Sequence, residues 1–213
     1  MDSIGIIGAG QMGAGIAQVS AQAGIHVFLS DVDVTRAQAG KDGIARVLGR
    51  QVEKGKLEQS ALDATLANIE PVAGYDAMGS AQIIIEAATE REDIKAKIFE
   101  AAGKVLGKDA VLASNTSSIS ITRLARFIGM HFFNPVPLMP LLEIIKGFAT
   151  IDATTEVARN FGMKIGKQTI VAADSPGFVV NRILLPLLNE SFFAVGERLA
   201  SIPDIDKGVK LGL

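Results

Sequence analysis

The chain of 213 residues contains no cysteine and only two histidines. The absence of cysteine excludes disulfide bonds and thiolate metal sites, and it is typical of proteins that work in a reducing cytoplasm. We predict no metal ligand elsewhere in the chain. The sequence also lacks a large excess of positive or negative charge, since its formal net charge is −2. The sequence therefore offers no basic surface that would indicate a nucleic-acid partner.

Long uninterrupted hydrophobic runs are lacking too. The most apolar segment, Phe178 to Val195, is broken by charged and polar residues and a proline, so we do not expect it to span a membrane. The interruptions are Arg182, Pro186, Asn189 and Glu190. Apolar residues occupy nearly every helical face of this segment, which predicts burial against another domain or subunit. The chain starts without a basic leader, so its first apolar residues are expected to form a strand and not a signal peptide.

The first two dozen residues predict a strand, a glycine-rich turn and a helix. Residues 3–7 form a short apolar run that leads directly into the turn. Apolar residues then recur at spacings of three and four, and Gly24 stands where a helix-ending residue with positive φ is expected. The residues of the turn, all predicted to bind a cofactor, are Gly8, Ala9, Gly10, Gln11, Met12 and Gly13.

Each glycine of the turn has a separate role if a dinucleotide binds there. Gly8 permits the tight turn, Gly10 lets the backbone approach the pyrophosphate, and Gly13 lets helix and strand pack closely. The helix then presents free N–H groups and about half a positive charge to the phosphates. Because the chain contains 22 glycines, the spacing alone is weak evidence, and its context must support it.

That context is a second strand, residues 27–30, which ends in Asp31, 23 residues after Gly8. A carboxylate at this place suits the adenosine ribose hydroxyls and would repel a 2′-phosphate. No arginine follows Asp31 directly, so NAD is favoured over NADP. The alternative is that Asp31 or Asp33 only caps the next helix.

Charged residues near two later helix ends leave open alternatives. A helix runs to about Lys54 with Gly55 as its stop, and Lys54 is either a solvated charge or a ligand for a phosphate-bearing substrate. A strand at residues 83–85, buried on both faces as a parallel sheet requires, is followed by Glu90 and Lys95. Each of these two is either a cap or surface charge, or a contact to the cofactor.

Five small polar residues, 114–118, follow the predicted strand 111–113. Such a run typically caps a helix, and Ser117 or Ser118 is the candidate cap of a helix that begins near Ile119. Its place at the carboxyl end of a strand is also typical of a binding residue.

The only histidine near a predicted strand end on the cofactor side is His131, within a run of aromatic residues and prolines. A lone histidine there is either a hydrogen-bonded core residue or a general acid and base. Glu143 favours the second interpretation, because strand alternation places it on the same face as Leu141 and Ile145. A carboxylate buried among aliphatic side chains needs a partner, and a histidine on a neighbouring strand would supply one.

We therefore predict an α/β fold. Residues 1–173 form a doubly wound, mostly parallel Rossmann sheet that binds NAD, and residues 174–213 begin an all-α domain. A helix at 152–161 and a strand at 168–172 complete the sheet. The long apolar helix is predicted to open at Asp174 with Pro176 in its first turn. Asn181 would then lie one turn inside that helix, directed either at the cleft or at solvent.

Taken together, these segments resemble the 3-hydroxyacyl-CoA dehydrogenase family, and most closely its bacterial 3-hydroxybutyryl-CoA branch. The matching stretches span nearly the whole chain in the family's order: residues 8–13, 86–90, 114–118, 131–137 with Glu143 beyond, and 174–182. The resemblance implies reversible hydride transfer between C3 of a short-chain L-3-hydroxyacyl-CoA and NAD, in fatty acid or butanoate metabolism. It also implies a homodimer formed through the helical domain when that domain is complete.

The resemblance further implies roles for single residues. His131 would remove the proton of the 3-hydroxyl group, and Glu143 would orient it. Ser117 and Asn181 would hydrogen-bond the oxygen on which negative charge develops. The residues assigned to NAD besides the glycine turn are Asp31, Glu90, Lys95 and Ser117, and those assigned to the acyl-CoA are Lys54, Ser117 and Asn134.

The chain departs from the family at two places. Between Ala125 and Arg126 the family carries roughly seven more residues. Either this chain has a true deletion there or a loop is missing from the sequence, and the good match on both sides favours the second. The family also continues past residue 213 with further helices, so we expect a truncated helical domain with an exposed apolar face.

Two other functions are compatible with the motifs. One is a hydroxy-acid or sugar-acid dehydrogenase that does not use CoA, against which Lys54 argues mildly. The other is a catalytically impaired NAD-binding protein. Both His131 and Glu143 argue against the second, because neither is needed to bind NAD.

Overall fold

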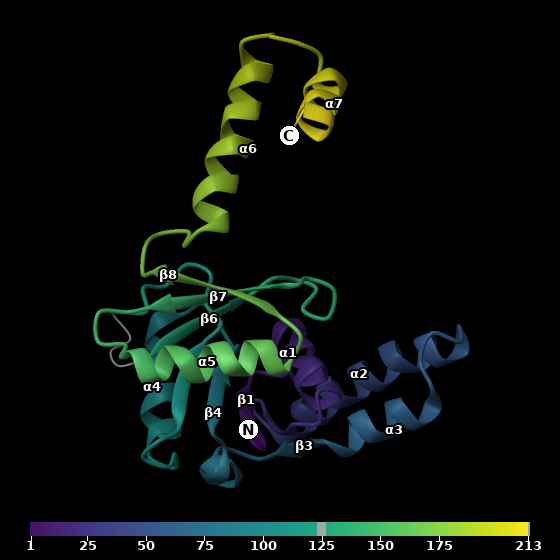
Figure 1. The fold of residues 1–213 in the computed structure, drawn as a ribbon, viewed down its shortest axis with the longest axis vertical. Coiled ribbons are helices and arrows are strands. Elements are labelled where there is room, and N and C mark those ends of the chain that lie inside the picture. Colours follow the sequence, from purple (N-terminus) through teal and green to yellow (C-terminus); the bar gives the residue numbers. More distant parts are fainter. Residues whose placement is uncertain (123–126, 213) are drawn as a thin grey trace. The chain divides into compact units, whose positions relative to one another are not determined.

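The computed structural model describes residues 1–122 and 127–212. Its packing divides the chain into two compact units, Met1–Asp174 and Ser175–Leu213 (Figure 1). The Ala125–Arg126 junction, where the sequence departs from its resemblance, lies outside the described residues. The assignment of residues 1–173 and 174–213 to an NAD-binding and a helical domain stays a prediction.

The first unit contains one eight-stranded sheet, in the order β3-β2-β1-β4-β5-β6-β7-β8. All neighbours pair in parallel except β6 and β7, which are antiparallel. The predicted doubly wound, mostly parallel sheet is therefore confirmed. The strands are β1 (Ser3–Ile7), β2 (His26–Ser30), β3 (Ile69–Val72), β4 (Ile83–Glu86), β5 (Val111–Ser114), β6 (Ile128–Phe132), β7 (Leu141–Lys146) and β8 (Gln168–Ala173).

The central strands are apolar on both faces, as expected for a parallel sheet covered by helices. Ile4 and Ile6 of β1 and all three isoleucines of β4 are fully buried. Fully buried residues of the helices, including Ile16, Leu48 and Phe161, belong to the same core. The helical elements of this unit are α1 (Gln11–Gln22), α2 (Val34–Glu53), α3 (Gln59–Ala67), the 3₁₀ helix η1 (Asp76–Ser80), α4 (Glu92–Gly103) and α5 (Asp152–Lys164).

The prediction of a helix that begins near Ile119 is wrong for residues 119–122, the part of it that the structure describes. Residues 117–119 form bends, residues 121 and 122 form a turn, and the next four residues lie outside the described ranges. The hydroxyl of Thr116 accepts from the backbone N–H groups of Ser118 and Ile119 at 3.3 and 3.0 Å. This side-chain bond holds a local turn, which is the alternative that small polar residues offer to a helix.

The second unit contains α6 (Val180–Gly196) and α7 (Ile202–Gly212), so the predicted start of an all-α region is confirmed. The expectation that Pro176 lies in the first turn of the long helix is wrong, because α6 begins four residues later. Gly177 and Phe178 have φ of +79° and +50°, and this left-handed conformation cannot continue into a right-handed helix. Asn181 is consequently the second residue of α6 and does not lie one turn inside it.

α6 has no buried residue, and large apolar side chains such as Ile183 and Phe192 are 67% and 76% exposed. Among the described residues, no helix combines the length and the apolar character that crossing a membrane requires.

The start of α1 approaches the backbone of the turn that precedes it closely. A β-carbon built on Gly13 would lie 1.7 Å from the carbonyl oxygen of Gly8. Only glycine therefore fits at position 13, as the predicted role in helix–strand packing requires.

We expect Gly13→Ala to destabilise the protein by about 1–3 kcal/mol or more, because the helix must move away from the Gly8 carbonyl. Gly49→Ala is the matched control, since it also lies inside a helix and its β-carbon would meet nothing within 4 Å. The control is expected to be stabilising by about 0.5–1 kcal/mol, the ordinary helix preference of alanine. Urea unfolding of both variants measures the difference, and equal stabilities would contradict the packing argument.

Candidate active site

The carboxyl ends of β1, β2, β4, β5 and β6 lie at one edge of the sheet, because these strands are parallel. The glycine turn follows β1, Asp31 follows β2, and the loops that carry Glu90 and Ser117 follow β4 and β5. His131 lies near the end of β6. Sheets of this type bind ligands at this edge, so the topology gathers most of the predicted site residues where a ligand is expected.

The glycine turn is shaped for the phosphates of a dinucleotide. Gly8 has φ of +104°, and its N–H donates to the carbonyl oxygen of Ser30 at 2.8 Å. A β-carbon on Gly8 would lie 2.7 Å from the backbone of Ala87, whereas one on Gly10 would meet no atom within 4 Å. Gly10 is the N-cap residue of α1, so the space above it faces the N–H groups at the positive end of this helix. These residues therefore fit a pyrophosphate.

Asp31 lies directly beside this turn. Its Oδ2 accepts from the N–H of Ala9 at 2.7 Å, and its side chain is only 14% exposed. The helix cap is the neighbouring acid, since Oδ1 of Asp33 accepts from the N–H of Arg36 at 2.8 Å. Asp33 is therefore the residue that caps the helix, whereas Asp31 binds the glycine turn.

A hollow of about 470 Å³ lies between the glycine turn and α2. Asp31 lines it together with small residues of both elements, so it offers space for a planar group beside the carboxylate. Its lining residues are Ala9, Gly10, Gln11, Ala14, Asp31, Arg36, Ala39, Gly40 and Gly43.

A buried network fixes the loop that follows β4. Glu86, fully buried, accepts through Oε2 from Nζ of Lys95 at 2.5 Å and from the hydroxyl of Ser114 at 3.1 Å. Its Oε1 accepts from the N–H groups of Ala88 and Thr89 at 2.8 and 3.3 Å. One carboxylate thus joins β4, β5, α4 and the loop in between.

Lys95 belongs to this network and is 1% exposed. Its predicted contact with NAD stays a prediction, and the contacts within the protein are those with Glu86 and Ser114. Sequence reasoning missed Glu86. The available signal was a carboxylate that ends an otherwise apolar, fully buried strand.

The structure brings Glu90 and Ser117 together. Oε1 of Glu90 accepts from the N–H and the hydroxyl of Ser117 at 3.2 and 3.4 Å, and Oε2 accepts from the hydroxyl of Thr116 at 2.6 Å. The loops after β4 and β5 are therefore joined at the edge of the sheet where the glycine turn lies. The polar run 114–118 connects loops and does not cap a helix in the described residues.

His131 and Glu143 face each other across the antiparallel pair of β6 and β7. Nδ1 of His131 lies 2.6 Å from Oε2 of Glu143, and the side chains are 7% and 0% exposed. An ionised carboxylate can only accept, so this contact assigns the proton of the neutral imidazole to Nδ1. Nε2 is then the basic nitrogen of the ring, which is the arrangement that a general base requires.

A buried lysine that the sequence did not single out holds the loop after β6. Nζ of Lys167 donates to the carbonyl oxygens of Val136 and Met139 at 2.5 and 2.8 Å, and burial lowers the pKa of Lys167. Val136 also packs against α1, because a β-carbon on Gly15 would lie 2.9 Å from it. This loop carries the exposed Asn134, predicted to contact the acyl-CoA.

Two further predicted residues do not belong to the loops described above. Lys54 is exposed at the carboxyl end of α2, and Asn181 belongs to the second unit. Their roles stay predictions.

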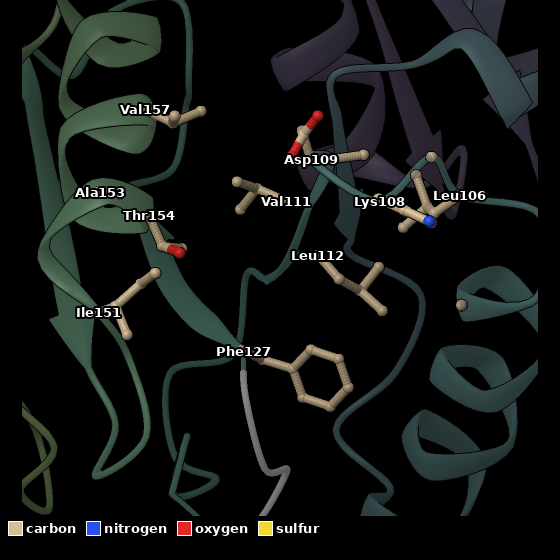
Figure 2. A pocket seen from close by; sticks show the side chains of 13 residues that line it. Leu106, Lys108, Asp109, Val111, Leu112, Phe127, Ile151, Ala153, Thr154 and Val157 are labelled. Carbon is tan, nitrogen blue, oxygen red and sulfur yellow. The ribbon is translucent and has the colours of Figure 1, made fainter.

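A larger hollow, of about 630 Å³, lies at a different place in the first unit (Figure 2). It is lined by the segment that enters β5 and by the start of α5, with Val111, Phe127 and Thr154 among the labelled side chains. Val111 opens its strand, so this hollow adjoins the amino end of β5, and its lining includes none of the predicted site residues. We do not place the cofactor there, because parallel sheets bind ligands at the carboxyl ends of their strands.

Comparison with known proteins identifies relatives along the whole chain. Residues 3–175 match the family model described as the NAD binding domain of 3-hydroxyacyl-CoA dehydrogenase, and residues 177–213 match that of its C-terminal domain. A 3-hydroxybutyryl-CoA dehydrogenase of Bradyrhizobium diazoefficiens is 47% identical, over 98% of this chain and 74% of the relative. A probable 3-hydroxybutyryl-CoA dehydrogenase of Deinococcus radiodurans is 43% identical, over 98% and 77%.

Among solved structures, the chain is similar to the (S)-3-hydroxybutyryl-CoA dehydrogenase of Ralstonia eutropha. The TM-score is 0.96 at 45% identity, and the match covers all of this chain and 77% of the other.

Gly10→Ala should weaken NADH binding and leave the free energy of unfolding nearly unchanged, because its methyl group enters open space above the turn. This is the space that the pyrophosphate backbone contact needs. Fluorescence titration with NADH, together with urea unfolding, separates the two effects. Unchanged NADH affinity would place the phosphates elsewhere.

Lys95→Met should cost about 3–5 kcal/mol of stability, because it leaves the Glu86 carboxylate buried without its cation. The double variant Glu86→Gln/Lys95→Met removes both charges and keeps an oxygen acceptor for the loop, so part of the loss should be recovered. Urea unfolding of the single and double variants measures the coupling. Additive losses would show that the two groups do not stabilise each other.

Proposed function

The chain belongs to the 3-hydroxyacyl-CoA dehydrogenase family and is an NAD-dependent oxidoreductase, and we propose that it oxidises a short-chain L-3-hydroxyacyl-CoA with His131 as general base. The observation that carries the proposal is the buried pair of His131 and Glu143, 2.6 Å apart. The names of the relatives support 3-hydroxybutyryl-CoA as the substrate.

In the proposed reaction, Nε2 of His131 takes the proton of the substrate's 3-hydroxyl group. NAD, when bound, supplies the acceptor for the hydride that leaves C3. Glu143 holds Nδ1 and stabilises the positive charge that the imidazole gains. Burial of Glu143 strengthens this interaction, because the local dielectric constant is lower than in water. In the reverse direction His131 returns the proton to the oxygen at C3.

Further polar residues are proposed to bind the substrate and the cofactor. Ser117 and Asn181 donate hydrogen bonds to the reacting oxygen, where charge develops. Glu90 accepts from the N–H of Ser117 and thereby holds its backbone. The hydroxyl of Ser117 donates to Glu90 in this structure, so in the proposed complex its single proton turns from Glu90 to the reacting oxygen. Asn134 and Lys54 are proposed to contact the acyl-CoA, and Asp31, Glu90, Lys95 and Ser117 the NAD.

We also propose that the enzyme works as a homodimer through its helical part, in fatty acid or butanoate metabolism in the cytoplasm. The exposed apolar side chains of α6 support the dimer, since they favour burial against another surface. Sedimentation velocity measures the assembly.

His131→Ala should lower kcat for acetoacetyl-CoA reduction by about 10²- to 10⁴-fold, the usual contribution of general acid–base catalysis. Glu143→Gln should lower kcat as well, with a smaller effect on KM, because it removes the orienting charge and keeps a side chain of the same size. The decrease in NADH absorbance measures both rates, and NADH titration checks that the cofactor still binds.

His26→Ala is the control, since it removes the other histidine, a half-buried residue that contacts Glu70 at the surface. It should retain the wild-type rate. A rate in His131→Ala equal to that of the control would remove His131 from the mechanism. An assay with a simple 3-oxo acid in place of acetoacetyl-CoA tests whether CoA is required, and an equal kcat/KM for both would contradict the proposed substrate class.

A further inference from the structure

An arginine lies beside the carboxylate that is predicted to bind the adenosine ribose. Nε of Arg36 is 3.3 Å from Oδ1 of Asp31. Arg36 belongs to the first turn of α2, and the fold brings it back to the end of β2. The arginine side chain is 69% exposed, whereas that of Asp31 is 14% exposed. Arg36 also lines the hollow between α2 and the glycine turn. Its side chain is thus accessible both to that hollow and to solvent.

The two oxygens of Asp31 are held from different sides. Oδ2 accepts from the N–H of Ala9 in the glycine turn, and Oδ1 accepts from the N–H of Val32 at 2.8 Å. Arg36 adds its positive charge on the Oδ1 side. The carboxylate is thus oriented, and its negative charge neutralises the arginine.

The second acid of this segment has a different partner. Asp33 accepts from the backbone N–H of Arg36 and caps α2. This contact uses the backbone of Arg36 and not its guanidinium group, which pairs with Asp31. Of the two acids, Asp31 therefore has the ion pair with Arg36 that the structure records.

This pair bears directly on cofactor choice. A dinucleotide whose ribose lies at Asp31 presents there either a 2′-hydroxyl, which a carboxylate accepts, or a 2′-phosphate, which it repels. A guanidinium group is the side chain that recognises such phosphates best, through charge-assisted and often bidentate hydrogen bonds. The chain contains both groups side by side.

We propose that Arg36 is a latent binding residue for a 2′-phosphate, and that the Asp31 carboxylate keeps it neutralised. The preference for NAD then depends on the masking of a cation that is present, and not on the lack of one. The inference rests on the proposed placement of the ribose at Asp31 and adds to it a residue that determines cofactor specificity.

The experiment measures the affinities of the full chain for NADH and NADPH by fluorescence titration, without acyl-CoA. Asp31→Ser makes room for the 2′-phosphate and removes the negative charge that neutralises Arg36. This variant should therefore bind NADPH at least about tenfold more tightly than the wild type does, and it should bind NADH more weakly. In Asp31→Ser/Arg36→Gln the gain for NADPH should disappear. Arg36→Gln alone should leave NADPH binding as weak as in the wild type.

Asp33→Asn is the matched control, because it removes one negative charge two residues away and keeps an oxygen that caps α2. Its NADPH affinity should stay at the wild-type level. An equal gain in Asp33→Asn and Asp31→Ser would attribute the effect to overall charge and overturn the proposal. Retention of the gain in the double variant would overturn it as well, since Arg36 would then not be the anchor.

Asp31→Asn keeps an acceptor for the N–H of Ala9 and serves as a second variant if the serine variant unfolds. A wild-type chain that binds NADH, with no NADPH gain in either Asp31 variant, would refute the role of Arg36 alone. If NADH affinity is also unchanged in both variants, the ribose does not lie at Asp31, and the proposed cofactor geometry fails together with the inference.

Discussion

A carboxylate buried inside a protein must receive hydrogen bonds or a positive charge, and this requirement organises the carboxyl edge of the sheet. Glu86 is fully buried at the end of β4, and four donors meet its two oxygens. By binding them it fixes the loop whose backbone packs against Gly8 and whose Glu90 holds Ser117. The glycine turn and the polar loop after β5 are thus positioned through one buried acid.

The same requirement selects the partner of Glu143. The sheet is parallel up to β6, and β7 then reverses direction, so that Glu143 falls opposite His131 in the register. Because Glu143 is fully buried, its charge is stabilised by the imidazole, and the imidazole is in turn held in one orientation. Asp31 is less buried, and its two oxygens interact with two backbone N–H groups and an exposed arginine. The proposed catalytic base and the proposed cofactor contact therefore both involve acids whose partners within the protein are fixed.

Much of this was predictable from neighbours in the sequence. Gly24 and Gly55 were expected to end helices, and their φ angles of +75° and +64° are those of a left-handed residue after a helix. The apolar strands and the adjacency of His131 and Glu143 followed from alternation and from the cost of burying a charge. Where local signals competed, prediction failed: the polar run 114–118 forms a turn through Thr116, and residues 177 and 178 delay the start of α6.

The sequence by itself determined the strand–turn–helix units, the glycine turn and the identity of the groups available for chemistry, because backbone conformation and burial depend mostly on residues nearby in the chain. Apart from the pair of His131 and Glu143, only the tertiary structure decided which distant side chains meet. Lys95 donates to Glu86, and Lys167 donates to the carbonyl oxygen of Val136. Arg36 forms an ion pair with Asp31. These pairings depend on strand order and on how each helix packs over the sheet, and a spacing along the chain does not encode either.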